Sequence, residues 1–270
     1  MTGAPWITTS WDDGHALDLR LADLLRHYNI PATFYIPRSA PRGVLSESQI
    51  RELSESFEIG AHTLDHVYLT EVDDARAAGQ IRDSKSWLQD VTGRPCTMFC
   101  PPAGKYTTAH LKMIRDAGFT GIRTVELLSL DLPRQSDGLL ITPTTIQVHP
   151  HGRSAYIRNA VKRRAWSNLF RFAACGFAPT WHQIAQAVLK RLSSGSVFHL
   201  WGHSWELEHT AQWTRLEDIL KLISDRAPDF HFAPNGVICS AACAAPTTPI
   251  TTSHSATCHS TPPPAPSTGL

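Results

Sequence analysis

The sequence predicts an α/β fold in which parallel strands alternate with helices. Apolar runs of period 2 take turns with amphipathic stretches of period 3.6 from residue 6 to about residue 235. This alternation is typical of parallel β/α units. Short polar clusters follow five of the expected strands, at residues 12–15, 62–66, 101–104, 123–124 and 203–206. Because the carboxyl ends of parallel strands meet at one edge of a sheet, these clusters predict one shared site.

The expected elements follow one another in a regular order. Ser46 and Gln49 form a capping box that opens a short helix, and Thr180 and Gln183 form a second one. Thr70 is the expected cap of a long helix that runs to about residue 91. The expected strands are 6–11, 32–36, 57–61, 96–100, 121–124, 196–200 and 231–233, and the other expected helices are 16–28, 108–117 and 213–226.

Length and composition predict one ordered domain followed by a tail. A chain of 270 residues can bury a sizeable core, and the regular alternation places that core within residues 1–235. Residues 236–270 are rich in Pro, Thr, Ser and Ala, and they carry almost no charge. We expect this tail to be disordered, because it has too little apolar surface to bury.

Charge and hydropathy argue against several classes of partner. A formal net charge of +1 predicts no strong field for nucleic acid or membranes. No stretch approaches the ~20 apolar residues that a membrane span needs, so no membrane insertion is expected, and the start of the chain lacks a signal-peptide pattern. The prediction is a cytoplasmic protein. Disulfides are not expected for the six cysteines in such a location. A structural zinc site is not expected either, because the two Cys-x3-Cys pairs lie far apart in the sequence.

Two histidines and two aspartates have the pattern of a metal site. His62 and His66 lie four residues apart, so both imidazoles can face one point on a helical turn or tight loop. A carboxylate from another strand would complete three ligands and leave an open position, as in catalytic zinc sites. Asp12 and Asp13 point in opposite directions at the end of a strand, so one can bind metal while the other reaches a water. Each pair alone also occurs in ordinary turns and helix surfaces.

Four motifs then occur in a specific order along the chain: TSWDDG at 9–14, His62-x3-His66, PPAG at 101–104 and the late His203. In order, spacing and strand context they resemble the motifs of the NodB-type polysaccharide deacetylases, carbohydrate esterase family 4, over about residues 6–232. The resemblance implies a distorted (β/α) barrel, with Asp13, His62 and His66 as metal ligands, Asp12 as general base and His203 as general acid.

The same resemblance implies a hydrolytic mechanism. The metal polarises an acetamide carbonyl, and Asp12 takes a proton from the attacking water. The backbone N–H of Ala103 helps to stabilise the resulting oxyanion, where one such donor contributes ~3 kcal/mol. His203 then protonates the departing amine.

The chain departs from the family pattern at Cys100. The family usually has an Arg before the two prolines, and that Arg pairs with the catalytic Asp, whereas a cysteine cannot supply this charge. Arg123, at the end of the next strand, is the candidate replacement, because an opposite charge within ~4–6 Å keeps a carboxylate ionised.

The last cluster offers two histidines and two tryptophans. His199, Trp201 and His203 lie on one side of the expected strand. We favour His203 as the acid, because it lies at the strand exit, and expect His199 in the core. Trp201 and Trp205 are candidates for stacking on a sugar ring, although large aromatic residues after a strand are as often packing residues. His15, Asp65 and Glu206 are expected to support the metal ligands.

The leading hypothesis is a metal-dependent hydrolase that removes an acetyl group from an N-acetylated sugar or glycan precursor. Zinc is favoured by the ligand types, and cobalt, nickel or manganese could use the same ligands. An alternative keeps the site but cleaves a non-sugar amide or cyclic imide. A second alternative is an inactive carbohydrate-binding module, against which the joint presence of base, metal ligands and acid argues. Residues 132–165 are interpreted as an insertion or loop over the mouth of the barrel, in which 141–149 look extended and the stretch from 153 to 171 is basic. The more ordinary interpretation of the basic run is a solvated helix face.

Overall fold

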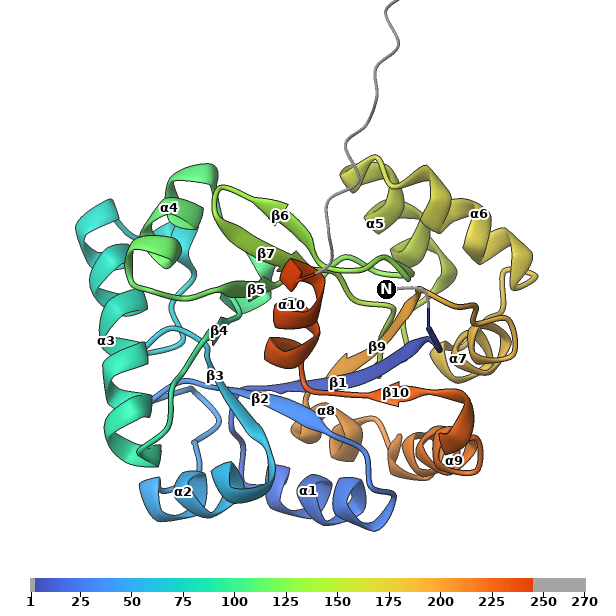
Figure 1. Cartoon of the computed structure of the whole chain (residues 1–270), viewed down its shortest axis with the longest axis horizontal. Coiled ribbons are helices and arrows are strands. Elements are labelled where there is room, and N and C mark those ends of the chain that lie inside the picture. The colour runs from blue at the N-terminus through green and yellow to red at the C-terminus, as the bar shows by residue number, and fades with distance from the viewer. Residues whose placement is uncertain (1–2, 245–270) are drawn as a thin grey trace, which may run out of the picture.

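A curled, mostly parallel sheet forms the centre of the computed structural model, which describes residues 3–244 (Figure 1). Its strands are β1 Trp6–Asp12, β2 Ala32–Ile36, β3 Glu58–Ala61, β4 Met98–Phe99, β5 Gly121–Arg123, β6 Arg134–Ser136, β7 Leu139–Thr142, β8 Ile146–Gln147, β9 Val197–Gly202 and β10 His231–Phe232. The helices are α1 Asp18–His27, α2 Glu47–Ser56, α3 Asp74–Thr92, α4 Thr108–Asp116, α5 Arg153–Arg163, α6 Trp166–Ala174, α7 Trp181–Leu189, α8 Ser204–His209, α9 Trp213–Ser224 and α10 Asn235–Ala244, with 3-10 turns at Leu69–Glu71, Pro102–Gly104 and Ala227–Asp229.

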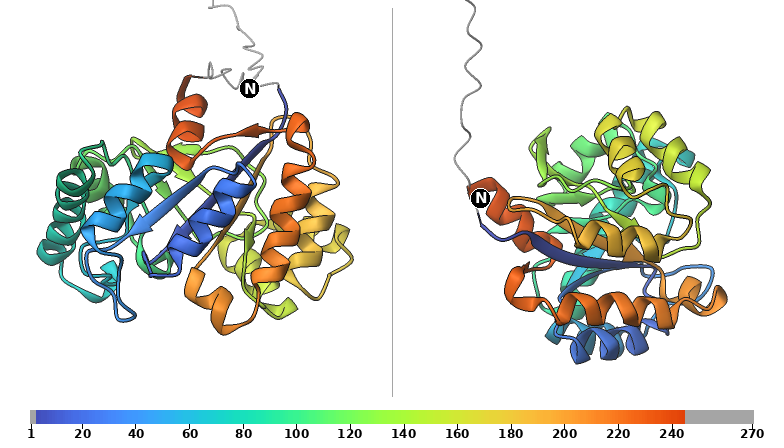
Figure 2. Two further views of the ribbon diagram at one scale, coloured as in Figure 1. Left: turned by 90° about the horizontal axis from the view of Figure 1, so that it is seen from below. Right: turned by 90° about the vertical axis from the view of Figure 1, so that its right-hand side faces the viewer.

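The strand order confirms the predicted α/β architecture. Strands follow the path β6-β7-β5-β4-β3-β2-β1-β9-β8, and β10 pairs with the start of β1. All pairs are parallel except β6 with β7. Most of the helices lie around the outside of the sheet (Figures 1 and 2). Within the described residues, no pairing joins β6 to β8, so the barrel is open and distorted.

Local sequence signals explain several helix boundaries. The capping box at Ser46 and Gln49 is present as expected. The long helix α3 is capped by Asp73, whose carboxylate accepts the Arg76 N–H, and the expectation of Thr70 as its cap is wrong because Thr70 belongs to a 3-10 turn. Thr180 caps α7 by accepting the Gln183 N–H.

The segment between β5 and α7 contains residues 132–165, which the sequence predicts to be an insertion or loop. It contributes β6, β7 and β8 to the sheet, and then forms two helices, α5 and α6, at one side of the molecule (Figure 1). The expected extended stretch thus pairs as β7 and β8 rather than forming a loop.

The ordered structure continues past the boundary expected at residue 235. Helix α10 lies across the end of the sheet at which the described chain begins (Figure 2). Ile238 and Cys239 are buried, at 0% and 1% exposure. The side chain of Asn235 accepts the Thr8 hydroxyl and donates to the Tyr35 hydroxyl, each at 2.9 Å.

The first part of the expected disordered tail is therefore a helix that plugs the barrel. Composition missed it because the segment has few large apolar side chains and no charge. The buried apolar side chains of this helix are those of Ile238 and Cys239, and its small residues let it approach the sheet. Residues 245–270 of the expected tail lie outside the described residues.

Within residues 3–244 no helix has the length and apolarity to span a bilayer.

The cysteines at 96, 100, 175, 239 and 243 are free. Cys96, Cys100 and Cys239 are buried and act as small core side chains.

The helical plug can be tested by one substitution. Ile238→Ala removes a fully buried side chain, so it should lower the free energy of unfolding by roughly 2–5 kcal/mol. Val237→Ala is the matched control, because Val237 is the next residue along the helix and its side chain is 50% exposed. Urea denaturation measures both. Equal, small effects of the two substitutions would contradict a plug role for α10.

Candidate active site

Four strands deliver polar side chains to one end of the barrel. Asp12 and Asp13 follow one another at the end of β1, His62 follows β3 directly, Arg123 ends β5, and His203 comes just after β9. These strands are neighbours, or nearly so, in the sheet order, and their carboxyl ends meet. The clusters predicted from the sequence therefore form one site.

A tight turn after β1 separates the two aspartates. Asp13 has φ of 80° and Gly14 has φ of 62°, both in the left-handed region. A Cβ atom on Gly14 would lie 2.7 Å from Cγ2 of Ile36, so only glycine fits there. The turn lets Asp12 point into the barrel while Asp13 faces His62 and His66.

Asp13, His62 and His66 form a cluster suited to a divalent metal. The Asp13 Oδ1 atom lies 3.0 Å from Nε2 of His66 and 3.5 Å from Nε2 of His62. One ligand atom from each of the three residues lies within 4.8 Å of the other two. Within residues 3–244 the same buried Oδ1 atom has no hydrogen-bond partner, as expected for an atom that serves a cation.

The electrostatics of this cluster favour an ionised carboxylate. Burial would raise the pKa of Asp13, but the imidazoles of His62 and His66 outweigh it and hold the pKa well below its usual range. A charged carboxylate with two imidazoles is the donor set that catalytic zinc uses.

The backbone is strained where these ligands sit. Asp13, Thr63 and His66 all have positive φ values, of 80°, 59° and 53°. Non-glycine residues adopt this region rarely, at a cost of about 1–3 kcal/mol each. The loop after β3 thus bends twice to aim both imidazoles at Asp13, which fits the tight loop that their spacing suggested.

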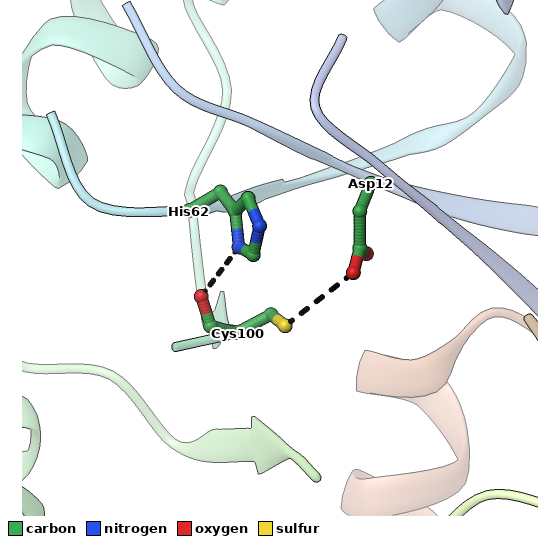
Figure 3. Close-up of side chains that lie close together, drawn as sticks. All are labelled: Asp12, His62 and Cys100. Atoms are coloured by element: carbon green, nitrogen blue, oxygen red, sulfur yellow. Dashed lines mark hydrogen bonds between the residues drawn. The ribbon is translucent and has the colours of Figure 1, made fainter. Parts of the chain in front are cut away.

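Two neighbours fix the orientation of the cluster. Nδ1 of His62 lies 2.7 Å from the Cys100 carbonyl oxygen (Figure 3). Its Nε2 atom lies on the side of Asp13, 3.5 Å from Oδ1. The Trp205 indole N–H donates to Oδ2 of Asp13 at 2.9 Å. Such outer hydrogen bonds orient metal ligands and set the histidine tautomer.

Asp12 is held by a buried arginine. Nη2 of Arg123 donates to Oδ1 of Asp12, and the two side chains are 0% and 5% exposed. The guanidinium is packed against two aromatic rings, with its central carbon 4.5 Å from the Trp201 ring centroid and 5.3 Å from that of Tyr35. Burial would lower the pKa of Arg123, but the Asp12 carboxylate raises it above its ordinary value.

Arg123 thus occupies the place that was predicted for the missing motif arginine. The Cys100 thiol also approaches Asp12, with its sulfur 4.0 Å from Oδ2 (Figure 3). Burial raises the pKa of Cys100 well above its usual range, so the thiol stays protonated and can only donate weakly to Asp12. Of Arg123 and Cys100, only Arg123 brings a positive charge to Asp12.

A second group of potential metal ligands, Asp12, His62 and Cys100, shares one histidine with the first. Its chemistry fits a metal less well. Thiols bind metals as thiolates, which the pKa of Cys100 disfavours, and one Asp12 oxygen already serves Arg123. The cluster around Asp13 is therefore the better metal site.

His203 lies beside both aspartates and is paired on its far side. Its Nε2 is 3.9 Å from an Asp12 oxygen and 4.0 Å from an Asp13 oxygen, while its Nδ1 is 2.8 Å from Oε2 of Glu206. Burial alone would lower the pKa of His203, but Glu206 and the two aspartates raise it to about 9. Burial would raise the pKa of Glu206, but His149 and His203 lower it to about 2, so Glu206 keeps its charge.

His199 belongs to the core, as expected. It is 1% exposed, and its Nε2 lies 2.8 Å from the Ser10 hydroxyl. Burial lowers the pKa of His199 to about 3, which keeps the ring neutral. This leaves His203 as the strand-exit histidine that can carry a proton.

The Pro-Pro-Ala-Gly loop forms one wall of a cavity beside His203. Ala103 has φ of 55°, and the adjacent Gly104 has φ of 63° with Val125 too close to admit a Cβ atom. Ala103, Trp201 and His203 line the same cavity of about 450 Å³. An acyl group bound there would lie between the Ala103 backbone and His203.

Both tryptophans have charged partners within the protein. Trp201 is 5% exposed and packs on the Arg123 guanidinium. One face of Trp205 is covered by the Arg42 guanidinium, 3.9 Å from the ring centroid, and its N–H donates to Asp13. Both rings therefore contact the charged residues, and stacking on a sugar ring stays a prediction.

Of the expected supporting residues, only Glu206 touches the site. His15 accepts the Leu17 N–H at the start of α1, and Asp65 pairs with Arg38 and Gln80. Neither contacts the metal cluster, because the loops carry both side chains away from it.

Sequence reasoning missed one buried acid, Asp18, on the first turn of α1. It is 0% exposed, and neither carboxylate oxygen has a hydrogen-bond partner among the described residues. Burial raises the pKa of Asp18 to about 8, which leaves it mostly neutral at pH 7. An aspartate in a first helical turn is so common that nothing in the sequence distinguishes it.

Comparison with known proteins finds a likeness in sequence over the first part of the chain. Residues 2–122 match the sequence model of the family described as "Polysaccharide deacetylase". A peptidoglycan-N-acetylglucosamine deacetylase of Bacillus cereus is 32% identical over 116 residues, which cover 42% of this chain and 53% of the relative. The peptidoglycan-N-acetylmuramic acid deacetylase PdaC of Bacillus subtilis is 32% identical over 100 residues, covering 36% of this chain and 21% of PdaC. The chain thus spans about half, or less, of the curated relatives it matches.

Solved structures extend the likeness in fold to most of the chain. A Mycobacterium smegmatis protein assigned to the polysaccharide deacetylases superimposes with a TM-score of 0.65 at 14% identity, over 89% of this chain and 91% of that one. A family 4 carbohydrate esterase from Streptomyces lividans gives a TM-score of 0.52 at 16% identity, over 85% and 92%. By its motifs and its sequence match over residues 2–122 the chain is similar to the polysaccharide deacetylases, and its distorted barrel has the fold of solved carbohydrate esterase family 4 structures.

Proposed function

We propose that this protein is a metal-dependent deacetylase that hydrolyses the acetamide C–N bond of an N-acetylated sugar. One observation carries the proposal. Two adjacent aspartates have separate partners, Arg123 on Asp12 and two histidines on Asp13, and His203 lies within 4.0 Å of both carboxylates. A base, a metal-binding group and an acid are thus gathered at one point.

Asp13, His62 and His66 would hold the metal. Zinc suits two imidazoles and one carboxylate best, and cobalt, nickel or manganese can use the same donors. A divalent ion at these ligands supplies a Lewis acid for the acetyl carbonyl and lowers the pKa of a bound water.

The protein's own residues supply the proton transfers. Asp12, fixed by Arg123, accepts a proton from the water whose oxygen attacks the carbonyl carbon. The Ala103 N–H donates to the oxygen that becomes negative. His203 then gives its proton to the sugar nitrogen as the C–N bond breaks, so the products are acetate and a free amine.

The substrate class follows from the relatives and from the cavity. The names of the Bacillus relatives specify N-acetylglucosamine and N-acetylmuramic acid units of peptidoglycan. For this chain we propose an N-acetylhexosamine unit of a glycan or glycan precursor, with its acetamide between Ala103 and His203. The cytoplasmic location stays a prediction.

Acetate release tests the function directly. Zinc-reconstituted protein should release acetate from N-acetylglucosamine oligomers, whereas Asp12→Asn should bind zinc but lose roughly 10²–10⁴-fold in kcat, because the base is gone. Metal content is assayed in both proteins. Turnover of simple amides or cyclic imides without turnover of any acetylated sugar would contradict the substrate class, and equal turnover by Asp12→Asn would contradict the base.

The role of Arg123 predicts a loss and a rescue. Arg123→Ala should lower kcat about 10²-fold or more, because Asp12 loses its counter-charge and its fixed position. It should also cost roughly 3–5 kcal/mol of stability, since a buried carboxylate is left unpaired. Arg115→Ala, which removes a largely exposed arginine, is the control.

Adding Cys100→Arg to Arg123→Ala should restore part of the activity, because the two side chains approach the same carboxylate. Full activity of Arg123→Ala across pH would show that Asp12 does not need this arginine.

Glu206 should position His203 and hold its proton. Because the Glu206 carboxylate raises the pKa of His203, Glu206→Gln should lower that pKa. His203 must be protonated to act as the acid, so the loss of activity with rising pH should begin at a lower pH in the variant. The basic limb of the kcat profile should therefore move down, with kcat at its optimum reduced at least about tenfold. Glu208→Gln, on the exposed side of α8, is the control. An unmoved basic limb would mean that Glu206 has only a structural role.

A further inference from the structure

Exposed apolar side chains are concentrated on one pair of helices. Among the described residues, six large hydrophobic side chains are exposed, and five of them lie on or just after α5 and α6: Ile157, Val161, Trp166, Phe170 and Phe177. Phe170 is 76% exposed and Trp166 is 57% exposed. Val237 on α10 is the sixth. Such a concentration marks an interaction surface, whereas single exposed apolar residues are ordinary.

These side chains share the outer face of the helices. Ile157 and Val161 are one turn apart on α5, and Trp166 and Phe170 are one turn apart on α6. The inner faces are packed separately, with Tyr156 and Phe172 buried. The outer face is therefore left over after the helices have formed their share of the core.

Polar contacts fix the helix pair on the barrel. The Asn159 amide accepts from the Leu127 N–H and donates to the Val125 carbonyl, both at 3.0 Å. The buried Asn168 donates to the Leu127 carbonyl at 2.9 Å, and Arg171 donates to the Leu128 carbonyl. Because these bonds tie α5 and α6 to the segment after β5, the apolar face is a fixed surface.

The segment that carries this surface has charged residues of one sign only. Residues 138–205 contain eight Lys or Arg residues and no Asp or Glu. Because the whole chain carries +1, the rest of it carries −7. Five of the eight lie in a short stretch on and after α5: Arg153, Arg158, Lys162, Arg163 and Arg164. None of these five forms an ion pair within residues 3–244.

We propose that α5 and α6 dock the protein on an anionic lipid surface. Exposed Trp, Phe and Ile on one face with Lys and Arg beside them are typical of helices that lie in the headgroup region of a membrane. The absence of acidic residues from the segment 138–205 matters, because an anionic surface attracts each nearby Lys or Arg and would repel each Asp or Glu. The helix pair lies at the edge of the molecule, where it can meet a flat surface (Figure 1).

Docking would place the candidate active site next to the membrane. Arg158, Asn159 and Lys162 of α5 line the same cavity as Ala103 and His203. The cavity would then open beside lipid headgroups, where a membrane-attached glycan is presented. Binding to lipid rests on the surface alone, so it does not depend on the proposed deacetylation.

Vesicle sedimentation of the full chain tests this surface. The protein should bind vesicles of phosphatidylcholine mixed with phosphatidylglycerol and should not bind phosphatidylcholine alone. Trp166→Glu combined with Phe170→Glu should weaken binding at least about tenfold, because apolar contact is lost and negative charge is added. Binding should also weaken as salt is raised.

Val237→Glu is the control, since it places a negative charge at the exposed apolar residue outside α5 and α6. It should bind anionic vesicles as the unmodified chain does. Circular dichroism checks that each variant is folded, and the substituted residues are exposed, so folding should be kept.

Three results would overturn the proposal. The first is a lack of binding to anionic vesicles, and the second is equal binding by the double variant. The third is self-association through Trp166 and Phe170 in place of vesicle binding, measured by sedimentation equilibrium, which would make this surface an interface between copies of the chain.

Discussion

The site depends on how two adjacent buried carboxylates are each given separate partners. Like charges side by side repel, and one of them would normally take up a proton. Here Arg123 lies against Asp12, and the imidazoles of His62 and His66 face Asp13. Asp18, the third carboxyl nearby, has its pKa raised to about 8, so it adds little charge at pH 7. The division of partners gives the two aspartates different chemistry.

The rest of the barrel serves this arrangement. Trp201 and Tyr35 enclose the Arg123 guanidinium, and Tyr35 in turn receives a hydrogen bond from Asn235 on the helical plug. The plug at one end of the barrel thus supports the charged pair near the other. The Arg123 guanidinium thus reaches Asp12 from β5, whereas Cys100 stands before the two prolines. The barrel interior is already lined for a buried cation.

Sequence reasoning identified the residues whose position depends on strand ends. Asp12, Asp13, His62, His66, Arg123 and His203 follow predicted strands, and the parallel order brings them together. It could not predict which way an indole points. Whether Trp205 offers its ring or its N–H depends on Asp13 and Arg42, which are distant in the chain. It also missed α10, whose burial depends on two side chains in a segment with the composition of a tail.

Average quantities hid the surface of α5 and α6 as well. A net charge of +1 suggested no field for membranes, yet it is the sum of a positive segment and a negative remainder. The apolar residues of α5 and α6 have helical spacing, which by itself predicts a buried stripe. Only the packing shows that Ile157 and Phe170 are exposed while Tyr156 and Phe172 fill the core.

The assignment of Asp13 rather than Asp12 to the metal is the central claim, and the optical spectrum of the cobalt-loaded protein tests it most directly. Cobalt bound by Asp13, His62 and His66 should give visible bands without a thiolate charge-transfer band in the near ultraviolet, and Cys100→Ser should leave the spectrum unchanged. A strong thiolate band that disappears in Cys100→Ser would place the metal on Asp12, His62 and Cys100, and would contradict the account.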